Sequence, residues 1–382
     1  METADNTGKT TRLGYFDIAK GIGIILVVIA HIEYVDLGIR NYIVSFHMPL
    51  FFVVSGMLSA HINEFGRPAK TVILKKLKRI MLPYLVFSVL FPVIDIVYFY
   101  ITGNGDPFGT LRQNIYDSLV LYGYSVLWFL PTAFFGDMFF FFVMKAASKI
   151  AEKYASVITF LVTLGISLII CFLFGHTGDH FIVAMVRFFP ASCLVSAGNL
   201  LYILVEKMRS RKVLAAAAGV FLLVLLVLIH GFNGTVDMHF GVYGKPVLYF
   251  INALIGSLGV ILISAAIDVT GQGDGSLGQG DGSLFREKPK QRTVPLSQTV
   301  PLSRSVAFYG RNSLFVMITH INFYILYCAE VLSFRITEYI PRAKNIVFNL
   351  MTVVFVLAAE FVLIKIYEIG KMKTVSLIRK NG

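Results

Sequence analysis

Lys20 and His31 lie in the first apolar segment of the chain, at a spacing that places a cation and a potential general base on one side of a helix. Eleven residues make about three helical turns, so a helix would carry both side chains on one side, roughly 16 Å apart. Asp17 falls within about 40° of the same side. A neutral imidazole is a natural general base for a hydroxyl, and an ammonium group attracts anions. The segment therefore predicts a helix with a cation near its start and a base near its end.

A second histidine, His47, opens the next apolar segment after a short polar turn. Because the turn is short, we expect His31 and His47 to approach one another. A lone histidine in a helix is more often structural, but two facing histidines beside a cation favour a catalytic interpretation. Asp17 or Glu33 could orient or tune the pair, and the sequence does not decide between them.

Two further segments carry candidate ligand-binding residues. Lys76 and Arg79 stand three residues apart in KKLKRIMLPY (75–84). They are either topology anchors or a cluster that binds the phosphates of a cytoplasmic cofactor. Trp128 marks the outer end of a later apolar run. An interfacial aromatic belt explains it, yet it could also form the wall of a sugar site.

A late segment, FYGRNSLFVMITH (308–320), combines a helix start with a deeper imidazole. Asn312 and Ser313 resemble the first residues of a helix. His320 follows about two turns later in an apolar context. It either makes an interhelical hydrogen bond or belongs to a site.

The composition identifies the scaffold that must position these residues. The chain has 382 residues, is 56% hydrophobic and 15% charged, and has a mean hydropathy of +0.74. These values indicate a polytopic membrane protein and exclude an ordinary soluble domain. The three cysteines lie in apolar stretches without metal-like spacing, so we expect neither a metal site nor a disulfide framework. The first apolar run lacks a small-residue cleavage site, so we expect no cleavable signal peptide.

Apolar runs near bilayer-spanning length predict an all-α membrane bundle of about ten transmembrane helices. The run at 183–204 is the weakest because Pro190 and several small polar residues interrupt it. We favour a kinked span packed inside the bundle, with a re-entrant segment as the alternative. The runs are 15–34, 42–61, 80–101, 124–145, 155–174, 183–204, 212–230, 246–268, 306–329 and 345–369.

The distribution of positive charge predicts the orientation. With both termini in the cytoplasm, about four fifths of the 34 Lys and Arg residues fall on the inner side. Topology therefore explains the net charge of +12, and no nucleic-acid partner is needed. We expect a multi-pass protein of the plasma (inner) membrane, with the lipid bilayer as its surroundings.

Residues 270–305 differ from the rest of the chain. They are polar and contain two tandem duplications, GQGDGSL at 271–277 and 278–284 and TVPLS at 293–297 and 299–303. Such a segment cannot bury a core, so we expect a disordered cytoplasmic insertion. Residues 1–269 and 306–382 then form one transmembrane domain.

Taken together, these motifs resemble the acyltransferase-3 family of integral membrane acyltransferases, in particular a branch similar to fucose 4-O-acetylases. The family carries a basic residue, ten intervening residues and a histidine in its first span, and Lys20 and His31 fit with Lys in place of the more usual Arg. FHMPLFFVVSGM (46–57) is similar to the second-span signature, KLKR (76–79) to the basic R-x-x-R position, and GRNSLFVMITH (310–320) to the late motif.

The resemblance implies transfer of an acyl group, usually acetyl, from cytoplasmic acyl-CoA to a hydroxyl of a cell-envelope carbohydrate. His31 would then be the general base, and His47 would stabilise the oxyanion or assist His31. The phosphates of acetyl-CoA, the acyl donor, would rest on Lys20, Lys76 and Arg79. The residues expected on the substrate side are Trp128, Asn312, Ser313 and His320.

Two other functions fit an apolar bundle with buried histidines. A polysaccharide or small-molecule transporter without chemistry would show an internal repeat with paired broken helices. The 183–204 run is interrupted, but no other run is equally so. An intramembrane sensor or assembly protein would use the histidines only structurally.

Overall fold

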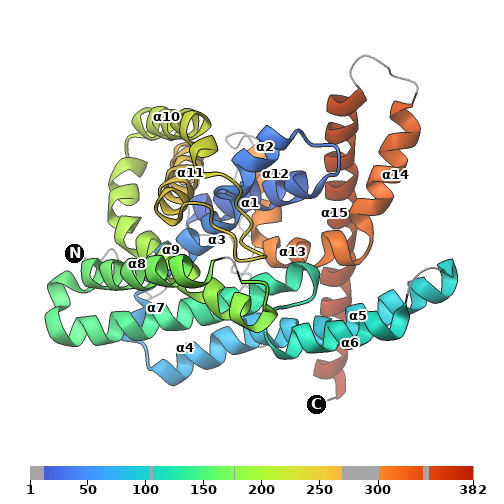
Figure 1. The fold of residues 1–382 in the computed structure, drawn as a ribbon, viewed down its shortest axis with the longest axis horizontal. Coiled ribbons are helices and arrows are strands. Elements are labelled where there is room, and N and C mark those ends of the chain that lie inside the picture. Colours follow the sequence, from blue (N-terminus) through green and yellow to red (C-terminus); the bar gives the residue numbers. More distant parts are fainter. Residues whose placement is uncertain (1–12, 104–105, 176, 269–300, 339–343, 382) are drawn as a thin grey trace. The chain divides into compact units, whose positions relative to one another are not determined.

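The structure is a computed structural model that describes residues 13–103, 106–175, 177–268, 301–338 and 344–381 (Figure 1). The described residues are almost entirely helical, and they contain no strand, only an isolated bridge between Asp237 and Val242. The predicted all-α fold is confirmed. The segment predicted as an insertion lies outside the described residues up to position 300, and residues 301–305 belong to a helix.

The described chain divides into two compact units. Unit 1 combines the N-terminal segment with the C-terminal third, and unit 2 holds residues 36–266. The helices of unit 1 are α1 (Gly14–His31), α12 (Pro301–Arg311), α13 (Ser313–Asn322), α14 (Ile325–Thr337) and α15 (Lys344–Asn381). Those of unit 2 are α2 (Leu37–Val44), α3 (His47–His61), α4 (Ala69–Lys76), α5 (Leu82–Thr102), α6 (Pro107–Leu119), α7 (Phe129–Ala151), α8 (Ala155–Phe174), α9 (His180–Arg209), α10 (Lys212–Ile229) and α11 (Pro246–Ile267).

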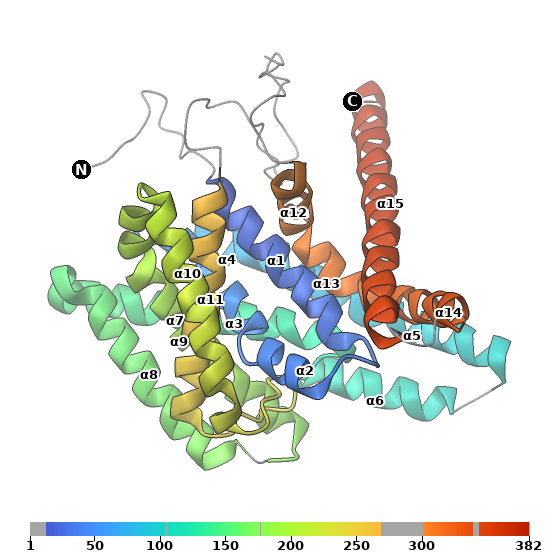
Figure 2. The same cartoon turned by 90° about the horizontal axis from the view of Figure 1, so that it is seen from above.

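In unit 1, α1 packs along α12 with the two backbones in direct contact (Figure 2). A side chain at Gly21 would collide with the carbonyl of Val306, and one at Gly310 would collide with the carbonyl of Asp17. Glycine is therefore required at both positions for this close approach. The contact holds the segment before Asn312 against the helix that carries Lys20.

In unit 2, α9 is the central helix and packs against α3, α7 and α8. A side chain at Gly56 of α3 would collide with the backbone of Val195, and one at Gly198 of α9 would collide with that of Val53. The expected burial of the 183–204 run is confirmed, because most of α9 is buried. The helix runs without a break through Pro190 and is long and apolar enough to be a single candidate span, which favours the span over the re-entrant alternative.

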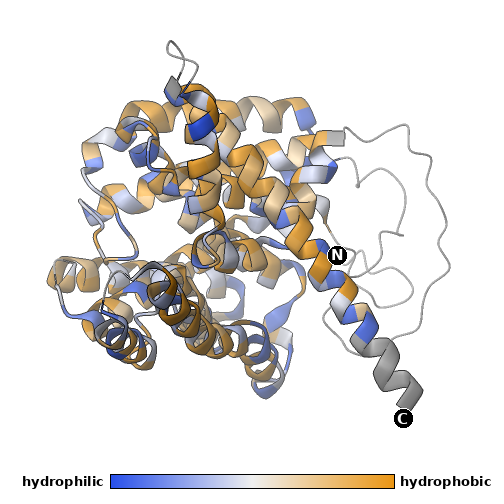
Figure 3. Cartoon of the chain, turned by 90° about the vertical axis from the view of Figure 1, so that its right-hand side faces the viewer, coloured by the Kyte–Doolittle hydropathy of each residue, from blue (hydrophilic) through white to orange (hydrophobic). Residues whose placement is uncertain are grey.

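Eight stretches of the described residues are long and apolar enough to cross a membrane, or nine if one bent pair is a single span. One of the eight, Ser125–Phe174, has 50 residues and contains both α7 and α8, which correspond to two of the predicted apolar runs. In Figure 3 most of the helical ribbon carries the colour of hydrophobic residues. The spanning windows of α10 and α15 are mostly exposed, as helices in contact with lipid should be.

Three local features differ from the sequence-based expectations. The turn before His47 contains a short helix, α2, capped by the Asp36 carboxylate, which accepts the N–H groups of Gly38 and Ile39. The run expected at 306–329 is broken: α13 and α14 meet at 65°, where Tyr324 adopts a φ of 56°. A π-helical turn at Leu77–Met81 joins α4 to α5.

Candidate active site

His31 and His320 form a histidine pair within unit 1. The Nε2 atom of His320 lies 3.4 Å from Nδ1 of His31, and the ring centroids are 5.2 Å apart at 60°. His31 is the last residue of α1, and His320 lies on α13 with none of its surface exposed. The first motif and the late motif therefore meet through His320, which was expected either to make an interhelical hydrogen bond or to belong to the substrate side of a site.

Backbone carbonyls select the tautomer of each ring. The Nδ1 atom of His31 lies 2.8 Å from the carbonyl oxygen of Val27, and that of His320 lies 2.8 Å from the carbonyl oxygen of Val316. A carbonyl only accepts, so both Nδ1 atoms carry the proton. The Nε2 atom of each neutral ring is then its basic nitrogen. This arrangement prepares His31 to take a proton through Nε2.

A buried carboxylate, Glu360, lies on α15 of the same unit. The hydroxyl of Thr319 contacts its two oxygens at 2.8 and 2.9 Å, and Glu360 has no exposed surface. No Lys, Arg or His within the described part of the chain forms an ion pair with it. Thr319 precedes His320, so this carboxylate lies beside the histidine segment. An ionisable residue in an apolar run was the signal that could have identified it.

Lys20 forms an ion pair with Asp17. Its Nζ atom lies 2.9 Å from Oδ1 of Asp17, and the two side chains are 21% and 6% exposed. The prediction that Asp17 shares the face of Lys20 is therefore confirmed. An anion that binds Lys20 would therefore compete with the carboxylate of Asp17 for the ammonium group.

Asn312 and Ser313 lie where α12 passes into α13. As predicted, the later helix begins at Ser313. Asn312 does not cap it with its side chain, because the Nδ2 group donates instead to the carbonyl of Phe308 at 3.0 Å. The side chain of Asn312 therefore binds back to α12, at the point where α12 passes into α13.

In unit 2, Lys76 lies between two carboxylates. Its Nζ atom is 2.8 Å from Oε2 of Glu64 and 2.6 Å from Oδ2 of Asp137, and the three side chains are at most 12% exposed. Ser59 donates to Glu64 at 2.8 Å. We call Lys76, Glu64 and Asp137 the charge triad. Its ammonium group already has two anionic partners, and its net charge is −1.

Arg79 lies on the exposed surface three residues after Lys76. Arg79 lies within the π-helical turn that follows Lys76, and a π turn has more residues per turn than an α-helix, so the usual i, i+3 neighbour relation does not apply. The two cations that the sequence placed together are therefore in different surroundings. Arg79 can bind a solvent-borne anion, and Lys76 is enclosed.

His47 is buried at the first turn of α3, and the carbonyl of Ile43 lies 3.0 Å from its Nδ1 atom. This again makes Nε2 the basic nitrogen. The helix start at His47 is confirmed.

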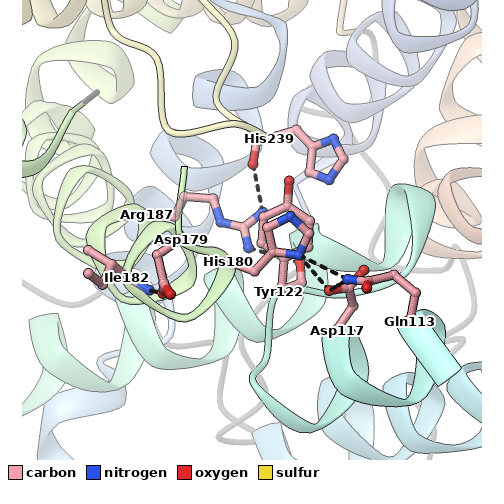
Figure 4. Close-up of polar contacts among 8 residues, drawn as sticks. All are labelled: Gln113, Asp117, Tyr122, Asp179, His180, Ile182, Arg187 and His239. Atoms are coloured by element: carbon pink, nitrogen blue, oxygen red, sulfur yellow. Dashed lines mark hydrogen bonds and ion pairs between the residues drawn. The ribbon is translucent and has the colours of Figure 1, made fainter. Parts of the chain in front are cut away.

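Trp128 belongs to a stack around a buried arginine, Arg187. Figure 4 shows Arg187 with Tyr122 and His239. The guanidinium of Arg187 lies 5.3 Å from the ring of Trp128 and 4.9 Å from that of Tyr122. It donates to the carbonyls of Tyr122 at 2.8 Å and His239 at 3.1 Å. Burial raises the pKa of the Tyr122 hydroxyl, and the Arg187 charge opposes that rise. Arg187 was not among the predicted site residues. An arginine within an apolar helical run is rare, and this rarity was the signal that could have identified it.

No group of three or more His, Cys, Asp or Glu in the described ranges could hold a metal ion.

The acyltransferase-3 family model, described as an acyltransferase domain, matches residues 13–365. The chain therefore belongs to this family of membrane proteins and is an O-acyltransferase. Together with its long apolar helices, this makes it a multi-pass integral membrane protein. No curated protein and no solved structure matches the chain.

Proposed function

We propose that this acyltransferase moves an acetyl group from cytoplasmic acetyl-CoA to a hydroxyl of a cell-envelope carbohydrate. The proposal includes location in the plasma membrane with both termini in the cytoplasm. The resemblance to the fucose 4-O-acetylase-like branch supports a hexose as the acceptor. The observation that carries the proposal is the 2.8 Å contact between Nδ1 of His31 and the carbonyl oxygen of Val27, which leaves Nε2 as the basic nitrogen.

In the proposed step, Nε2 of His31 takes the proton of the acceptor hydroxyl as the oxygen attacks the thioester carbonyl. The C–O bond forms, the C–S bond breaks, and the leaving thiolate receives the proton from the imidazolium. The products are the acetyl ester and CoA. We propose that His320, 3.4 Å from the ring of His31, holds that ring in position during both transfers. We propose that His47 stabilises the oxyanion or assists the base.

The donor phosphates need accessible cations. We propose Lys20 and Arg79 for this role, since the side chain of Lys20 is 21% exposed and Arg79 is exposed. Lys76 would have to leave two carboxylates to bind a phosphate. We therefore propose that Lys76 shapes the segment that presents Arg79. Arg79→Ala should raise the KM for acetyl-CoA without raising that for the acceptor.

For the acceptor we propose Trp128, Asn312, Ser313 and His320 as substrate-side residues. Trp128 and His320 are nearly or fully buried, which indicates support of the binding surface more than direct contact. Ser313 is partly exposed at the start of α13, where a hydroxyl could reach it.

The test is release of CoA by purified protein in nanodiscs, supplied with acetyl-CoA and hydrolysed envelope polysaccharide. His31→Gln should lower kcat by roughly 100- to 10,000-fold, the usual contribution of a general base. His230→Gln is the matched control, since His230 also binds a carbonyl four residues earlier through Nδ1. Full activity of His31→Gln would refute the assignment. Mass spectrometry of envelope glycans with and without the protein should show loss of an acetyl group.

The transporter alternative gains no support. Paired broken helices are its structural hallmark, and the described residues contain a single bent pair, α13 with α14.

A further inference from the structure

Unit 2 contains an Asp–His pair that the proposed transfer step does not use (Figure 4). Nδ1 of His180, the first residue of α9, lies 2.6 Å from Oδ1 of Asp117 on α6. The amide of Gln113 donates to the same oxygen at 2.9 Å. A carboxylate at this distance holds the proton on Nδ1, so Nε2 of His180 is a hydrogen-bond acceptor.

The imidazole of His180 is held in one orientation. The ring of Tyr122 stacks on it at 4.0 Å with an interplanar angle of 9°. The guanidinium of Arg187 lies on Tyr122 and binds its carbonyl. Each group is therefore fixed by the next, and Nε2 points in one direction before any ligand arrives. Such preorganisation lowers the entropy cost of binding.

The accessible part of this cluster has the chemistry of a sugar-binding surface. The side chain of His180 is 35% exposed, Tyr116 is 45% exposed, and the two rings lie 6.5 Å apart. Gln113 is exposed beside them. An aromatic face, an amide and an imidazole acceptor suit the C–H face and hydroxyls of a sugar ring.

The carboxylate of Asp117 disfavours an anionic ligand at His180. Asp117 is negative, and its partners here are His180 and the amide of Gln113. Arg187 is fully buried, so its charge cannot contact a ligand at the surface. A phosphate or carboxylate at His180 would face the carboxylate of Asp117. Arg112 is exposed on the same helix, so a methyl uronate and a hexose phosphate are the ligands that test this preference.

We infer that Gln113, Tyr116 and His180 form a binding subsite for a neutral sugar ring, with Asp117 as its positioning residue. A sugar hydroxyl donates to Nε2 of His180, and the ring rests on Tyr116. In this inference the bound sugar would be part of the acceptor. In that respect alone, the subsite rests on the proposed function and deepens it.

The test is saturation-transfer NMR of neutral methyl hexopyranosides with the full chain in nanodiscs. Wild type should show transfer to the ring protons. His180→Asn and Tyr116→Leu should each raise Kd at least about tenfold, the effect of losing one well-placed contact. Asp117→Asn should weaken binding because Nδ1 loses its acceptor. His230→Asn is the matched control and should bind as wild type does.

A second measurement uses the wild-type chain alone, so that it does not depend on the folding of a variant. Diethyl pyrocarbonate modifies exposed imidazoles, and the glycosides should slow modification of His180 but not of His230. A pair that only fastens α6 to α9 would show no such protection. Absence of saturation transfer in wild type, unchanged Kd in His180→Asn, or tighter binding of a methyl uronate or hexose phosphate would overturn the inference.

The two proposals fail separately. His31→Gln should lose CoA release and keep glycoside binding. If wild type releases no CoA yet binds glycosides through His180, the acetyl transfer is wrong and the subsite stands. If CoA release is normal and glycosides do not bind at His180, the subsite is wrong and the transfer stands.

Discussion

Replacement of Lys76 by Met tests whether the charge triad of unit 2 is structural. The change takes the net charge of the triad from −1 to −2 and leaves Glu64 and Asp137 enclosed without their cation. Breaking a buried pair by removing one partner costs about 3–5 kcal/mol. At most 12% of each side chain is exposed, so water can offset little of this cost.

Fluorescence can follow the unfolding of the unit that holds the triad. The chain has a single tryptophan, Trp128, and it lies in unit 2. Titration of detergent micelles with dodecyl sulfate should show Lys76→Met unfolding about 3–5 kcal/mol more easily than wild type. Lys70→Met, an exposed lysine on α4, should change stability by less than about 1 kcal/mol.

A double variant separates electrostatics from packing. Adding Asp137→Asn to Lys76→Met returns the triad to a net charge of −1 and should recover part of the lost stability. If Lys76 instead binds donor phosphates, Lys76→Met should keep its stability and show a raised KM for acetyl-CoA. That result would refute the structural role.

The remaining predictions concern single residues. His320→Ala should lower kcat about tenfold or more while leaving the KM for acetyl-CoA unchanged, because it removes the group that positions His31; unchanged kcat would contradict this. Gly310→Ala should destabilise α1 against α12, whereas Gly370→Ala, with open space around it, should not; thermal melts compare them. Burial raises the pKa of Asp237 in the folded protein above its unfolded value of 3.8. This group therefore contributes to folding stability below pH 3.8, and the contribution is lost as the pH rises through the raised pKa. Asp237→Asn should therefore flatten the stability profile over that interval, and an unchanged profile would contradict the sign.

Helix periodicity was sufficient to predict local relations. The position of Asp17 beside Lys20 follows from a spacing of three residues, and the start of α13 at Ser313 follows from the polar pair that precedes it. Both depend only on neighbours in sequence. The all-α fold likewise follows from apolar runs that must satisfy their own backbone.

Long-range pairing could not be predicted in the same way. The partners of Lys76 lie 12 and 61 residues away, and a single sequence does not specify which carboxylates meet it. The π-helical turn that contains Arg79 also has no obvious sequence signal. His31 contacts His320 across 289 residues, a relation set by the close approach of α1 and the α12–α13 segment.

The glycine contacts between α3 and α9 restrict how unit 2 can move during turnover. Backbone lies against backbone at Gly56 and Gly198, so neither helix can slide past the other without a steric clash. His47 opens α3 and Arg187 lies within α9, and these two residues must therefore travel as one rigid body. Spin labels at exposed positions of the two helices should keep a constant separation through the catalytic cycle.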